Sequence, residues 1–335
     1  MTALPFVSRR RLLRLAAVGV VAVPALSIAT DASAASAGPS GPDDQTIPNA
    51  EARDTHARNT EARNTAVVRR AFAEFYGGGR TERFAEFFDH GYIEHDPAIA
   101  AGRSGLLAWV RQTQAQRPRS ITSIKRIIAQ GSMVAVHSHR STTPADEMTG
   151  TAVIELFSLR AGRIVEHWTY TQAVPATTRS GNSMFSNVYA YPGTPPVVTR
   201  TRADANRQLI LKAWAAVFSA RDLTVLDRYW APGNGYLQHN PNVPNGVGGL
   251  KGFLGTLPPS VSQNRFSVAA GDLVLTVNQS VATSGDLDSD LVGSAVADVY
   301  RIVDGRAVEH WDVVSPVPTT SANDHSVFSR LHPEL

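Results

Sequence analysis

The sequence predicts an α+β protein built from two tandem copies of one domain. The segment Gly-Arg-x-Val-Glu-His-Trp occurs at residues 162–168 and again at residues 305–311. A second element, Tyr-x-x-His-x-Pro, begins at Tyr92 and again at Tyr236, with almost the same separation between copies. In each copy the apolar residues recur first at helical spacing and then in alternation, which predicts helices followed by strands. A repeat of this length is a duplicated domain and not a solenoid.

The first part of each copy carries three predicted helices. The apolar stripes of the first helices consist of Val68, Phe72, Phe75 and Tyr76 in one copy and Ile210, Ala213, Trp214, Val217 and Phe218 in the other. A short second helix is expected to carry Phe84, Phe87 and Phe88, and its counterpart to cover residues 223–230. Glycine-rich turns at Gly102 and Gly246 then lead into a third helix in each copy.

After the third helix the apolar period changes from 3.6 to 2. In the first copy, strands are expected at residues 121–129, 133–141, 151–160 and 163–171. Gly131-Ser132 and Ala161-Gly162 supply turns, with Gly271-Asp272 and Asp304-Gly305 as their counterparts. Helices followed by a meander of long strands indicate helices packed on one face of a curved antiparallel sheet.

Residues 1–37 have the features of a bacterial export signal. Twin arginines at Arg9 and Arg10 precede an apolar run at residues 15–28, which is too short to span a bilayer. The stretch resembles a twin-arginine translocation signal, with small-x-small cleavage sites that end at Ala34 and Ala37. The resemblance implies that the protein folds in the cytoplasm and resides in the periplasm or outside the cell.

The rest of the chain divides into a tether, two domains and a linker. Residues 38–63 are rich in Pro, Gly, Asp, Asn and Thr, and we expect a flexible tether that is at most transiently helical near its end. Residues 64–186 form the first domain, called repeat 1, and residues 203–330 form the second, called repeat 2. The linker at residues 187–202 contains the Pro-rich segment 191–196, which disfavours regular structure.

Composition excludes several classes of function. The chain has 335 residues and no cysteine, so disulfides, thiolate nucleophiles and cysteine-ligated metals are excluded. The formal net charge of +3 falls to zero without residues 1–37, which hold four arginines and one aspartate, so no nucleic-acid binding is expected. No phosphate-binding loop, dinucleotide fingerprint or nucleophile elbow is present, and no cofactor is predicted.

These elements resemble the SnoaL-like family of the nuclear transport factor 2-like superfamily. The resemblance rests on the order of elements, the Tyr-x-x-His-x-Pro element, the Gly-x-x-Gly turn and the final Glu-His-Trp strand, and it covers nearly all of both repeats. It implies two tandem cone-shaped α+β barrels, each around an apolar cavity of the kind that polyketide cyclases, ketosteroid isomerases and limonene epoxide hydrolases use. One scaffold hosts many chemistries and also non-catalytic members. Members often dimerise through the open face of the sheet, so we expect a pseudo-twofold dimer within one chain.

The final strand of repeat 2 carries the candidate base. Alternation places His310 and Asp312 on one face, with Glu309 and Trp311 on the other, and we expect the first pair to face the cavity. Members of the family use an acidic cavity residue as the base of an aldol closure, and Asp312 resembles that residue. Apolar surroundings would raise the pKa of Asp312 and suit it to proton abstraction beside a carbonyl. The alternative is that His310 packs on the helices while Asp312 lies in water.

Repeat 1 differs at this position, because Thr169 stands where repeat 2 has Asp312. A threonine hydroxyl cannot deprotonate carbon near neutral pH, so the chemistry is expected in repeat 2. Repeat 1 carries Glu155 on the preceding strand, where repeat 2 has Asp298. Each of these carboxylates is either available for chemistry or a structural partner of the neighbouring histidine.

Further histidines are candidates for ligand contacts. His95 and His239, from the Tyr-x-x-His-x-Pro elements, are expected at the cavity to polarise a carbonyl, or alternatively to bind the backbone. His137 and His139 share one strand face in repeat 1 only, and with Glu155 and His95 they offer metal-ligand chemistry. Repeat 2 lacks this set and no known zinc spacing occurs, so no metal site is predicted.

The sequence therefore predicts an exported, cofactor-free enzyme that abstracts a proton from a small hydrophobic carbonyl or polyketide-like compound. Asp312 is the expected base, with His310, His239 and Asp298 as orienting groups. The residues expected to contact the ligand are Tyr92, His95, His137, Glu155, His167, Trp168, Tyr236 and Trp311. The alternatives are a non-catalytic binding protein and an epoxide hydrolase, although no arginine is evident between Asp298 and Asp312.

Overall fold

The computed structural model describes residues 50–117 and 119–332. The predicted export signal and the first part of the tether lie outside these residues. Within the described part of the chain, no helix combines the length and the apolar character that a membrane span needs.

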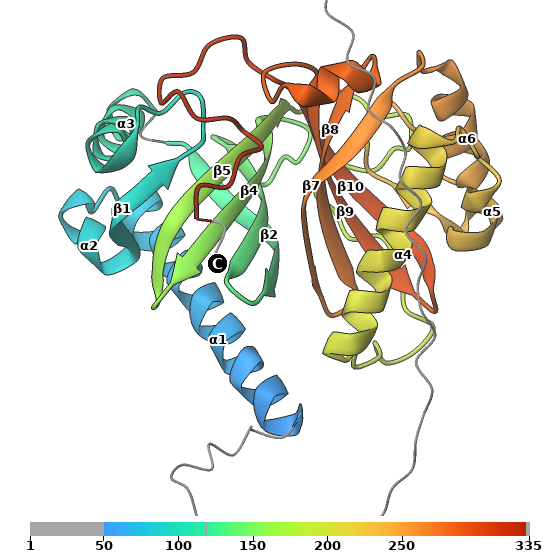
Figure 1. Ribbon diagram of the computed structural model, residues 1–335, viewed down its shortest axis with the longest axis horizontal. Coiled ribbons are helices and arrows are strands. Elements are labelled where there is room, and N and C mark those ends of the chain that lie inside the picture. The colour runs from blue at the N-terminus through green and yellow to red at the C-terminus, as the bar shows by residue number, and fades with distance from the viewer. Residues whose placement is uncertain (1–49, 118, 333–335) are drawn as a thin grey trace, which may run out of the picture. The chain divides into compact units, whose positions relative to one another are not determined.

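Repeat 1 combines helical elements with a five-stranded sheet, whose first strand precedes the last helix (Figure 1). The helical elements are α1 (Ala50–Arg70), its direct π-helical continuation η1 (Ala71–Gly77), η2 (Thr81–Arg83), α2 (Phe84–Phe87) and α3 (Gly102–Gln116). The strands are β1 (Phe88–Glu94), β2 (Ile121–Gln130), β3 (Met133–Ser141), β4 (Thr151–Arg160) and β5 (Arg163–Ala173), in the spatial order β1-β5-β4-β3-β2. The four strands expected from alternation are confirmed to within two residues.

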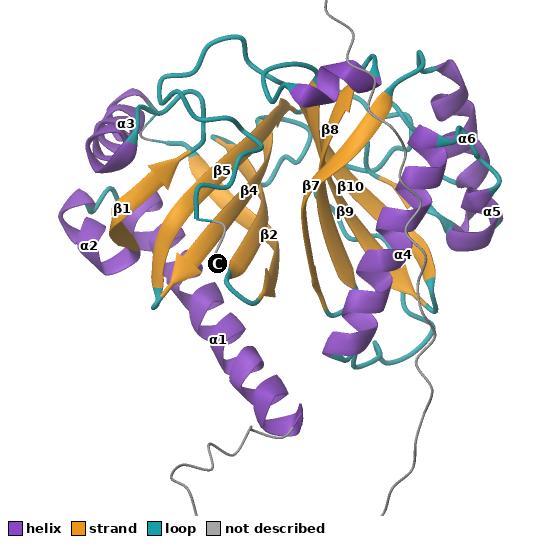
Figure 2. Cartoon of the chain, in the orientation of Figure 1, coloured by secondary structure: helices purple, strands orange, loops and turns teal. Residues whose placement is uncertain are grey.

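Repeat 2 has the same strand order, β6-β10-β9-β8-β7 (Figure 2). Its helical elements are α4 (Arg200–Ser219), α5 (Val225–Tyr229), η3 (Gly233–Gly235), α6 (Val247–Thr256) and η4 (Ser284–Asp288). Its strands are β6 (Leu237–Gln238), β7 (Val261–Ala270), β8 (Leu273–Val281), β9 (Ser294–Val303) and β10 (Arg306–Pro316). The α+β class and the two-barrel organisation agree with the prediction.

One edge of each sheet differs from the predicted antiparallel meander. β1 runs parallel to β5, and β6 runs parallel to β10, so both sheets are mixed. His95 N–H donates to the carbonyl of His167 at 2.9 Å, and His239 N–H donates to that of His310 at 2.9 Å. The parallel edge therefore brings the Tyr-x-x-His-x-Pro element beside the Glu-His-Trp strand in each repeat.

The predicted flexible tether is wrong for residues 50–63, which belong to α1. This segment is rich in Ala, Arg and Glu, which favour helix. The Glu61 carboxylate accepts hydrogen bonds from Gly131 N–H at 2.8 Å and from Arg200 at 2.7 Å. Asn64 donates to the carbonyl of Gly131 at 3.1 Å. These contacts hold α1 against the β2–β3 turn, so the helix does not depend on local sequence alone.

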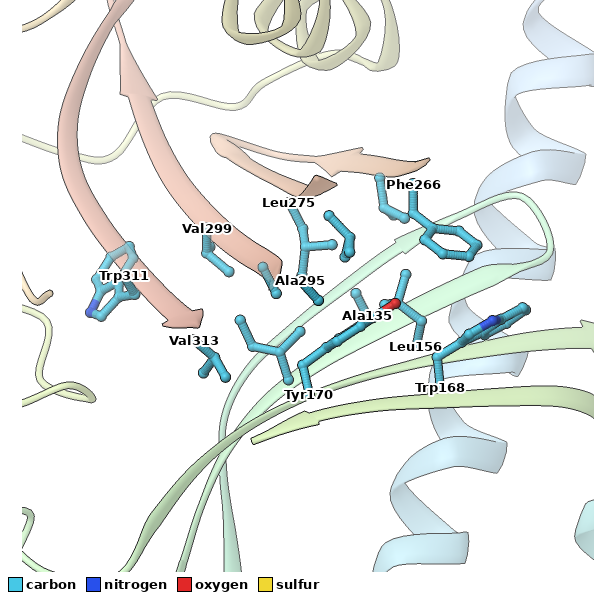
Figure 3. Close-up of a cluster of buried hydrophobic side chains, with 14 of the residues drawn as sticks. Ala135, Leu156, Trp168, Tyr170, Phe266, Leu275, Ala295, Val299, Trp311 and Val313 are labelled. Carbon is cyan, nitrogen blue, oxygen red and sulfur yellow. The ribbon is translucent and has the colours of Figure 1, made fainter. Parts of the chain in front are cut away.

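Three apolar clusters stabilise the fold. One lies between the helices and sheet of repeat 1, and another lies between the helices and sheet of repeat 2. The third combines buried side chains of both sheets, including Trp168 and Tyr170 from β5 and Trp311 and Val313 from β10 (Figure 3). Trp168 packs on Phe266 of repeat 2, with ring centroids 5.0 Å apart. The two sheets therefore share one core, and the described residues fall within a single compact unit.

Each repeat also binds the segment that follows the final strand of the other. Residues 183–189, called arm 1, contact repeat 2, and residues 326–331, called arm 2, contact repeat 1. His239 Nδ1 donates to the carbonyl of Ser183 at 2.5 Å, and His95 Nδ1 donates to that of Ser326 at 2.9 Å. Trp311 donates to arm 1 and Trp168 to arm 2, through Nε1 in both cases. The exchange follows the sequence repeat, since equivalent residues make equivalent bonds.

The Gly-x-x-Gly turns are needed where the third helix of each repeat begins. Gly102 has a φ of 66° and Gly246 a φ of 87°, which is the left-handed region that glycine tolerates best. A Cβ on Gly105 would lie 1.8 Å from the carbonyl oxygen of Ala100. The second glycine of the turn therefore permits a close approach between helix and loop.

We expect Gly105→Ala to lower the free energy of unfolding by about 1–3 kcal/mol, because the backbone has to move to admit the methyl group. Gly248→Ala is the control, since a Cβ there meets nothing within 4 Å. The control is expected to stabilise α6 by about 0.5–1 kcal/mol. Urea unfolding of both variants measures the difference, and equal stabilities would contradict the close approach.

Candidate functional site

The final strands present their two faces to different surroundings. The His310 ring stacks on Tyr300 on the helix side of repeat 2, with centroids 4.5 Å apart, whereas Trp311 lies in the shared core. In repeat 1, His167 likewise stacks on Phe157 at 4.7 Å. His167 therefore borders a described cavity, whereas the expectation that His310 and Asp312 face a cavity stays a prediction.

A cavity of about 320 Å³ lies in repeat 1, within the size range of small-molecule sites. Its apolar walls include Phe72, Ile99, Trp109 and Val110. Its polar lining includes Tyr76, Asp96, Arg140, Glu155, His167 and Thr169. A pocket on repeat 2 between α4 and α6 is smaller, at about 80 Å³, and does not include Asp312.

His167 lies between two carboxylates beside this cavity. Its Nδ1 is 3.1 Å from Glu94 Oε1, and its Nε2 is 3.4 Å from Glu155 Oε1 and 3.1 Å from the hydroxyl of Thr169. Tyr92 donates its hydroxyl hydrogen to Glu94 at 2.5 Å, which orients that carboxylate. Burial disfavours the charged ring, but Glu94 and Glu155 outweigh burial and raise the pKa of His167 to about 10. The His167 ring is therefore protonated and positively charged near neutral pH.

This raised pKa predicts a loss of stability at alkaline pH. The unfolded chain has a histidine pKa near 6.5, so His167 stabilises the fold fully below pH 6.5 and loses this contribution as the pH rises toward 10. The loss is expected to be on the order of a few kcal/mol, since each pKa unit corresponds to about 1.4 kcal/mol. Urea unfolding between pH 6 and 10 measures it, and His167→Gln should flatten this dependence. An equally steep loss in that variant would contradict the assignment.

Two polar atoms of the cavity are buried and have no hydrogen-bond partner within the described structure: Glu155 Oε2 and the hydroxyl of Tyr76. Burial, followed by the charges of Glu94 and Glu155, raises the pKa of Tyr76 well above its usual value, so the phenol remains a donor. Burial also raises the pKa of Asp96. Two residues that line the cavity thus carry a carboxylate oxygen and a hydroxyl without a partner within the described structure.

The structure brings Asp298, His310 and Asp312 together in repeat 2. His310 Nε2 is 3.0 Å from Asp298, and Asn240 donates to Asp312 at 2.5 Å. Burial raises the pKa of Asp312 to about 6; His310 opposes this shift and Asp298 adds to it. The expected raised pKa is confirmed, while the role of Asp312 as a base stays a prediction. Tyr236 is buried beside this cluster, 6.5 Å from the His310 ring.

The expectation that His95 and His239 line the cavity is wrong. Both rings bind the exchanged arms and stack on Trp168 and Trp311, with centroids 4.7 Å and 5.0 Å apart. The reason is alternation along β1, which puts His95 on the face opposite Tyr92 and Glu94. Trp168 and Trp311 face the shared core for the same reason, so they do not line a ligand site.

His137 and His139 also lie on the face toward the other repeat. The register pairs Glu155 with Val136, so the two histidines point to the opposite side of the sheet from Glu155. Arg126 donates to His137 Nδ1 at 2.9 Å, and burial followed by the Arg126 charge lowers the pKa of His137. His139 stacks on Phe185 of arm 1 at 4.3 Å. The metal set considered for repeat 1 is therefore not assembled.

The residues that sequence reasoning missed are Tyr76, Glu94, Asp96, Trp109 and Arg140. Two of them were signalled by the repeated motif, because repeat 1 has Glu94 and Asp96 where repeat 2 has Gln238 and Asn240. The comparison of the final strands drew attention to Thr169 and Asp312 alone. Acidic residues on the parallel edge strand compensate for that threonine.

One family model and several solved structures match parts of this chain. A family model described as a SnoaL-like domain matches residues 68–167. No curated protein matches the chain. Three solved structures are similar to parts of this chain. One is wild-type IdmH, which is a candidate polyketide cyclase from Streptomyces antibioticus. The others are a SnoaL-like protein of unknown function from Burkholderia thailandensis and Bal32a from a soil-derived mobile gene cassette.

Each of these structures aligns with about one repeat of this chain. IdmH is 22% identical over 32% of this chain and 91% of its own, with a TM-score of 0.28. The Burkholderia protein is 15% identical over 34% of this chain and 97% of its own, with a TM-score of 0.29. Bal32a is 16% identical over 34% of this chain and 92% of its own, and its TM-score is also 0.29. The family match contains β1, α3, β4 and the first half of β5, and with them most of the cavity lining. Residues 68–167 are therefore a SnoaL-like domain.

Proposed function

We propose that repeat 1 is a cofactor-free acid–base site that abstracts a proton from the carbon beside a carbonyl of a small hydrophobic compound. One observation carries this proposal: Glu155 Oε2 and the Tyr76 hydroxyl are buried, have no partner and line the same cavity. A free carboxylate oxygen and a neutral phenol are the two groups that enolisation needs. The product is an isomer or an aldol-type cyclisation product.

Glu155 is the base in this reaction. Its Oε2 takes the proton from the substrate carbon, the electron pair of the C–H bond forms a carbon–carbon double bond, and the π pair of the carbonyl moves to its oxygen, which gives an enolate. The Tyr76 hydroxyl donates a hydrogen bond to that oxygen. The enolate carbon then attacks a second carbonyl, or it is protonated at another position, and Glu155 returns its proton to the product.

His167 positions the base without touching the substrate. Its Nε2 lies 3.4 Å from Glu155 Oε1, and its raised pKa keeps a positive charge beside this oxygen. Glu94 holds the other ring nitrogen at 3.1 Å. The imidazolium therefore directs Oε1 away from the ligand and leaves Oε2 to accept the proton.

The apolar walls favour a hydrophobic substrate. Phe72, Ile99 and Trp109 line the cavity, and a polyketide-like compound fits both these walls and the SnoaL-like character of residues 68–167. The twin-arginine-type signal supports an exported enzyme, which acts on a compound found outside the cytoplasm. The alternative is an exported protein that binds such a compound without converting it.

A second candidate, epoxide hydrolysis, is favoured by one residue. An epoxide hydrolase of this kind needs an arginine beside two acidic residues. Repeat 1 offers this set, because Arg140 lines the same cavity as Asp96 and Glu155. Two carboxylates and a guanidinium can orient a water molecule and donate to an opening epoxide oxygen.

Solvent exchange tests the proposal. The mature protein is incubated in D₂O with a panel of β-diketones, cyclic ketones and an epoxide, and mass spectrometry follows each compound. We expect deuterium at the carbon beside the carbonyl in at least one ketone. Quenching of tryptophan fluorescence by a compound that takes up no deuterium would support the alternative, a protein that binds the compound without converting it. Opening of the epoxide without ketone exchange would support the second candidate.

A further inference from the structure

We propose that Asp298, His310 and Asp312 bind one divalent transition-metal ion, of the Mn²⁺ or Zn²⁺ type, inside repeat 2. One ligand atom from each residue lies within 4.8 Å of the other two. The residues come from β9 and β10, which place Asp298 directly opposite Asp312. This proposal concerns repeat 2 and does not depend on the chemistry proposed for repeat 1.

The distances within the cluster suit metal ligands. His310 Nε2 and Asp298 Oδ1 are 3.0 Å apart. Two ligands on one ion at about 2.0–2.2 Å lie roughly 3 Å from each other. Asp312 supplies the third ligand, because its Oδ1 is buried and has no hydrogen-bond partner within the described structure. The three residues are only 3–5% exposed, so an unpaired carboxylate oxygen here is costly unless a cation approaches it.

Gln238 holds one side of the His310 ring, and the other ring nitrogen, Nε2, faces Asp298. Gln238 Oε1 accepts from the backbone N–H groups of His239 and Asn240, both at 2.8 Å, which fixes the orientation of the amide. The same oxygen lies 2.9 Å from His310 Nδ1, so Nδ1 carries the hydrogen. Histidines that ligate metals donate their other ring N–H to such an oxygen. A bound ion would take the place of the hydrogen that Nε2 shares with Asp298 Oδ1 at 3.0 Å.

Repeat 1 provides an internal comparison. There His167 has a carboxylate on each side, with Glu94 at Nδ1 and Glu155 at Nε2, and a protonated ring satisfies both. Repeat 2 has the neutral Gln238 in place of Glu94 and has Asp312 in place of Thr169. Each repeat thus places two carboxylates near its histidine, but in repeat 2 the Nδ1 atom faces the neutral Gln238 instead of a carboxylate. The cation that balances them is a ring proton in repeat 1 and a metal ion in repeat 2.

The donor set selects the class of metal. One imidazole and two carboxylates suit Mn²⁺, Fe²⁺ or Zn²⁺, whereas Ca²⁺ and Mg²⁺ prefer oxygen ligands alone. Asn240 donates to Asp312 Oδ2 at 2.5 Å, and Asn278 donates to Asp298 Oδ2 at 3.1 Å. These amides orient the carboxylates and leave Asp312 Oδ1 for the ion. Two carboxylates and a divalent ion also make the buried cluster neutral.

Metal titration of the purified mature protein tests the proposal. The protein is treated with a chelator and then supplied with Zn²⁺ or Mn²⁺, both in the folded state and during refolding from urea, because the site is closed. We expect one equivalent of metal per chain and a rise of several degrees in the melting temperature, since a ligand that binds only the folded state stabilises it. Bound Mn²⁺ should also lose its free-ion electron paramagnetic resonance signal.

Variants locate the ion. Asp312→Asn is expected to lower the metal affinity at least 100-fold, and Gln238→Leu by about 10–100-fold, because Gln238 acts through His310. Glu155→Gln, at the position of Asp298 in repeat 1, is the matched control and should still bind one equivalent. An unchanged melting temperature of the wild-type protein with 1 mM Zn²⁺ and 1 mM Mn²⁺ would overturn the proposal, even if a variant failed to fold. One equivalent bound tightly by Asp312→Asn would also overturn it.

Discussion

Replacing Glu155 with Gln is expected to lower the rate of ketone deuteration at least 100-fold and to change the ligand affinity less than threefold. The amide has the shape of the carboxylate, so the apolar walls of the cavity still bind the compound. It cannot take a proton from carbon, and a positioned general base contributes about 10²–10⁴-fold. Mass spectrometry measures the deuteration, and quenching of tryptophan fluorescence measures the affinity.

Two further variants separate the base from the donor. Glu155→Asp retains a carboxylate in a shifted position and is expected to give an intermediate rate. Tyr76→Phe removes the free hydroxyl, and loss of one such donor typically costs about 10²–10³-fold. Deuteration at the wild-type rate by Glu155→Gln would exclude Glu155 as the base, whatever the other two variants do.

Glu309→Ala is expected to lower the free energy of unfolding by about 3–5 kcal/mol, the range typical of breaking a buried ion pair. Glu309 is fully buried, and it accepts hydrogen bonds from Arg301 at 3.0 Å, from His239 at 3.1 Å and from Val188 N–H of arm 1 at 2.6 Å. The substitution leaves these donors without their shared acceptor. Urea unfolding measures the loss, and arm 1 should become accessible to proteolysis.

Glu166→Ala is the matched comparison in repeat 1. Glu166 accepts from Leu331 N–H at 2.6 Å and pairs with His95 at 3.4 Å, but Ser158 stands where repeat 2 has Arg301. Because no guanidinium loses its partner here, the free energy of unfolding is expected to fall by only about 1–3 kcal/mol. Equal losses in the two variants would contradict the role of Arg301, and no loss in either would contradict the anchoring of the arms.

The strands could be predicted from the sequence because their signals are local. β3 and β4 begin and end where alternation and the flanking turns place them. Glycines at Gly131 and Gly162 adopt positive φ in those turns, a conformation that few other residues tolerate. The alternation of apolar residues and the glycine turns together were sufficient to predict the antiparallel strands of each repeat.

The parallel edge strands and the exchanged arms could not be predicted in this way. β1 pairs with β5, far along the chain, and its sequence carries no mark of strand direction. Arm 2 binds the carboxylate of Glu166 through the backbone N–H of Leu331, a contact that almost any residue could make. α1 is stabilised in part by the bond from Arg200 of repeat 2 to Glu61, which local composition does not reveal.

The candidate site was predicted in part. The sequence points to Glu155 and His167, which line the cavity of repeat 1, and to Asp298, His310 and Asp312, which form a buried cluster in repeat 2. Sequence reasoning placed the chemistry in repeat 2 on the strength of Asp312, whereas the larger cavity lies in repeat 1. Whether a cone is hollow depends on how side chains from several elements fill it, such as Trp109 from α3 and Phe72 from η1. That volume is a tertiary property, so no single motif carries it.

The most direct test of the account compares Glu155→Gln and Asp312→Asn side by side. Both are assayed for deuteration of the ketone that the wild-type protein exchanges fastest, at the same pH and at saturating ligand. The account predicts that Glu155→Gln loses the exchange and that Asp312→Asn, whose effect is confined to repeat 2, keeps it. Exchange that survives Glu155→Gln and disappears with Asp312→Asn would contradict the account and place the reaction in repeat 2.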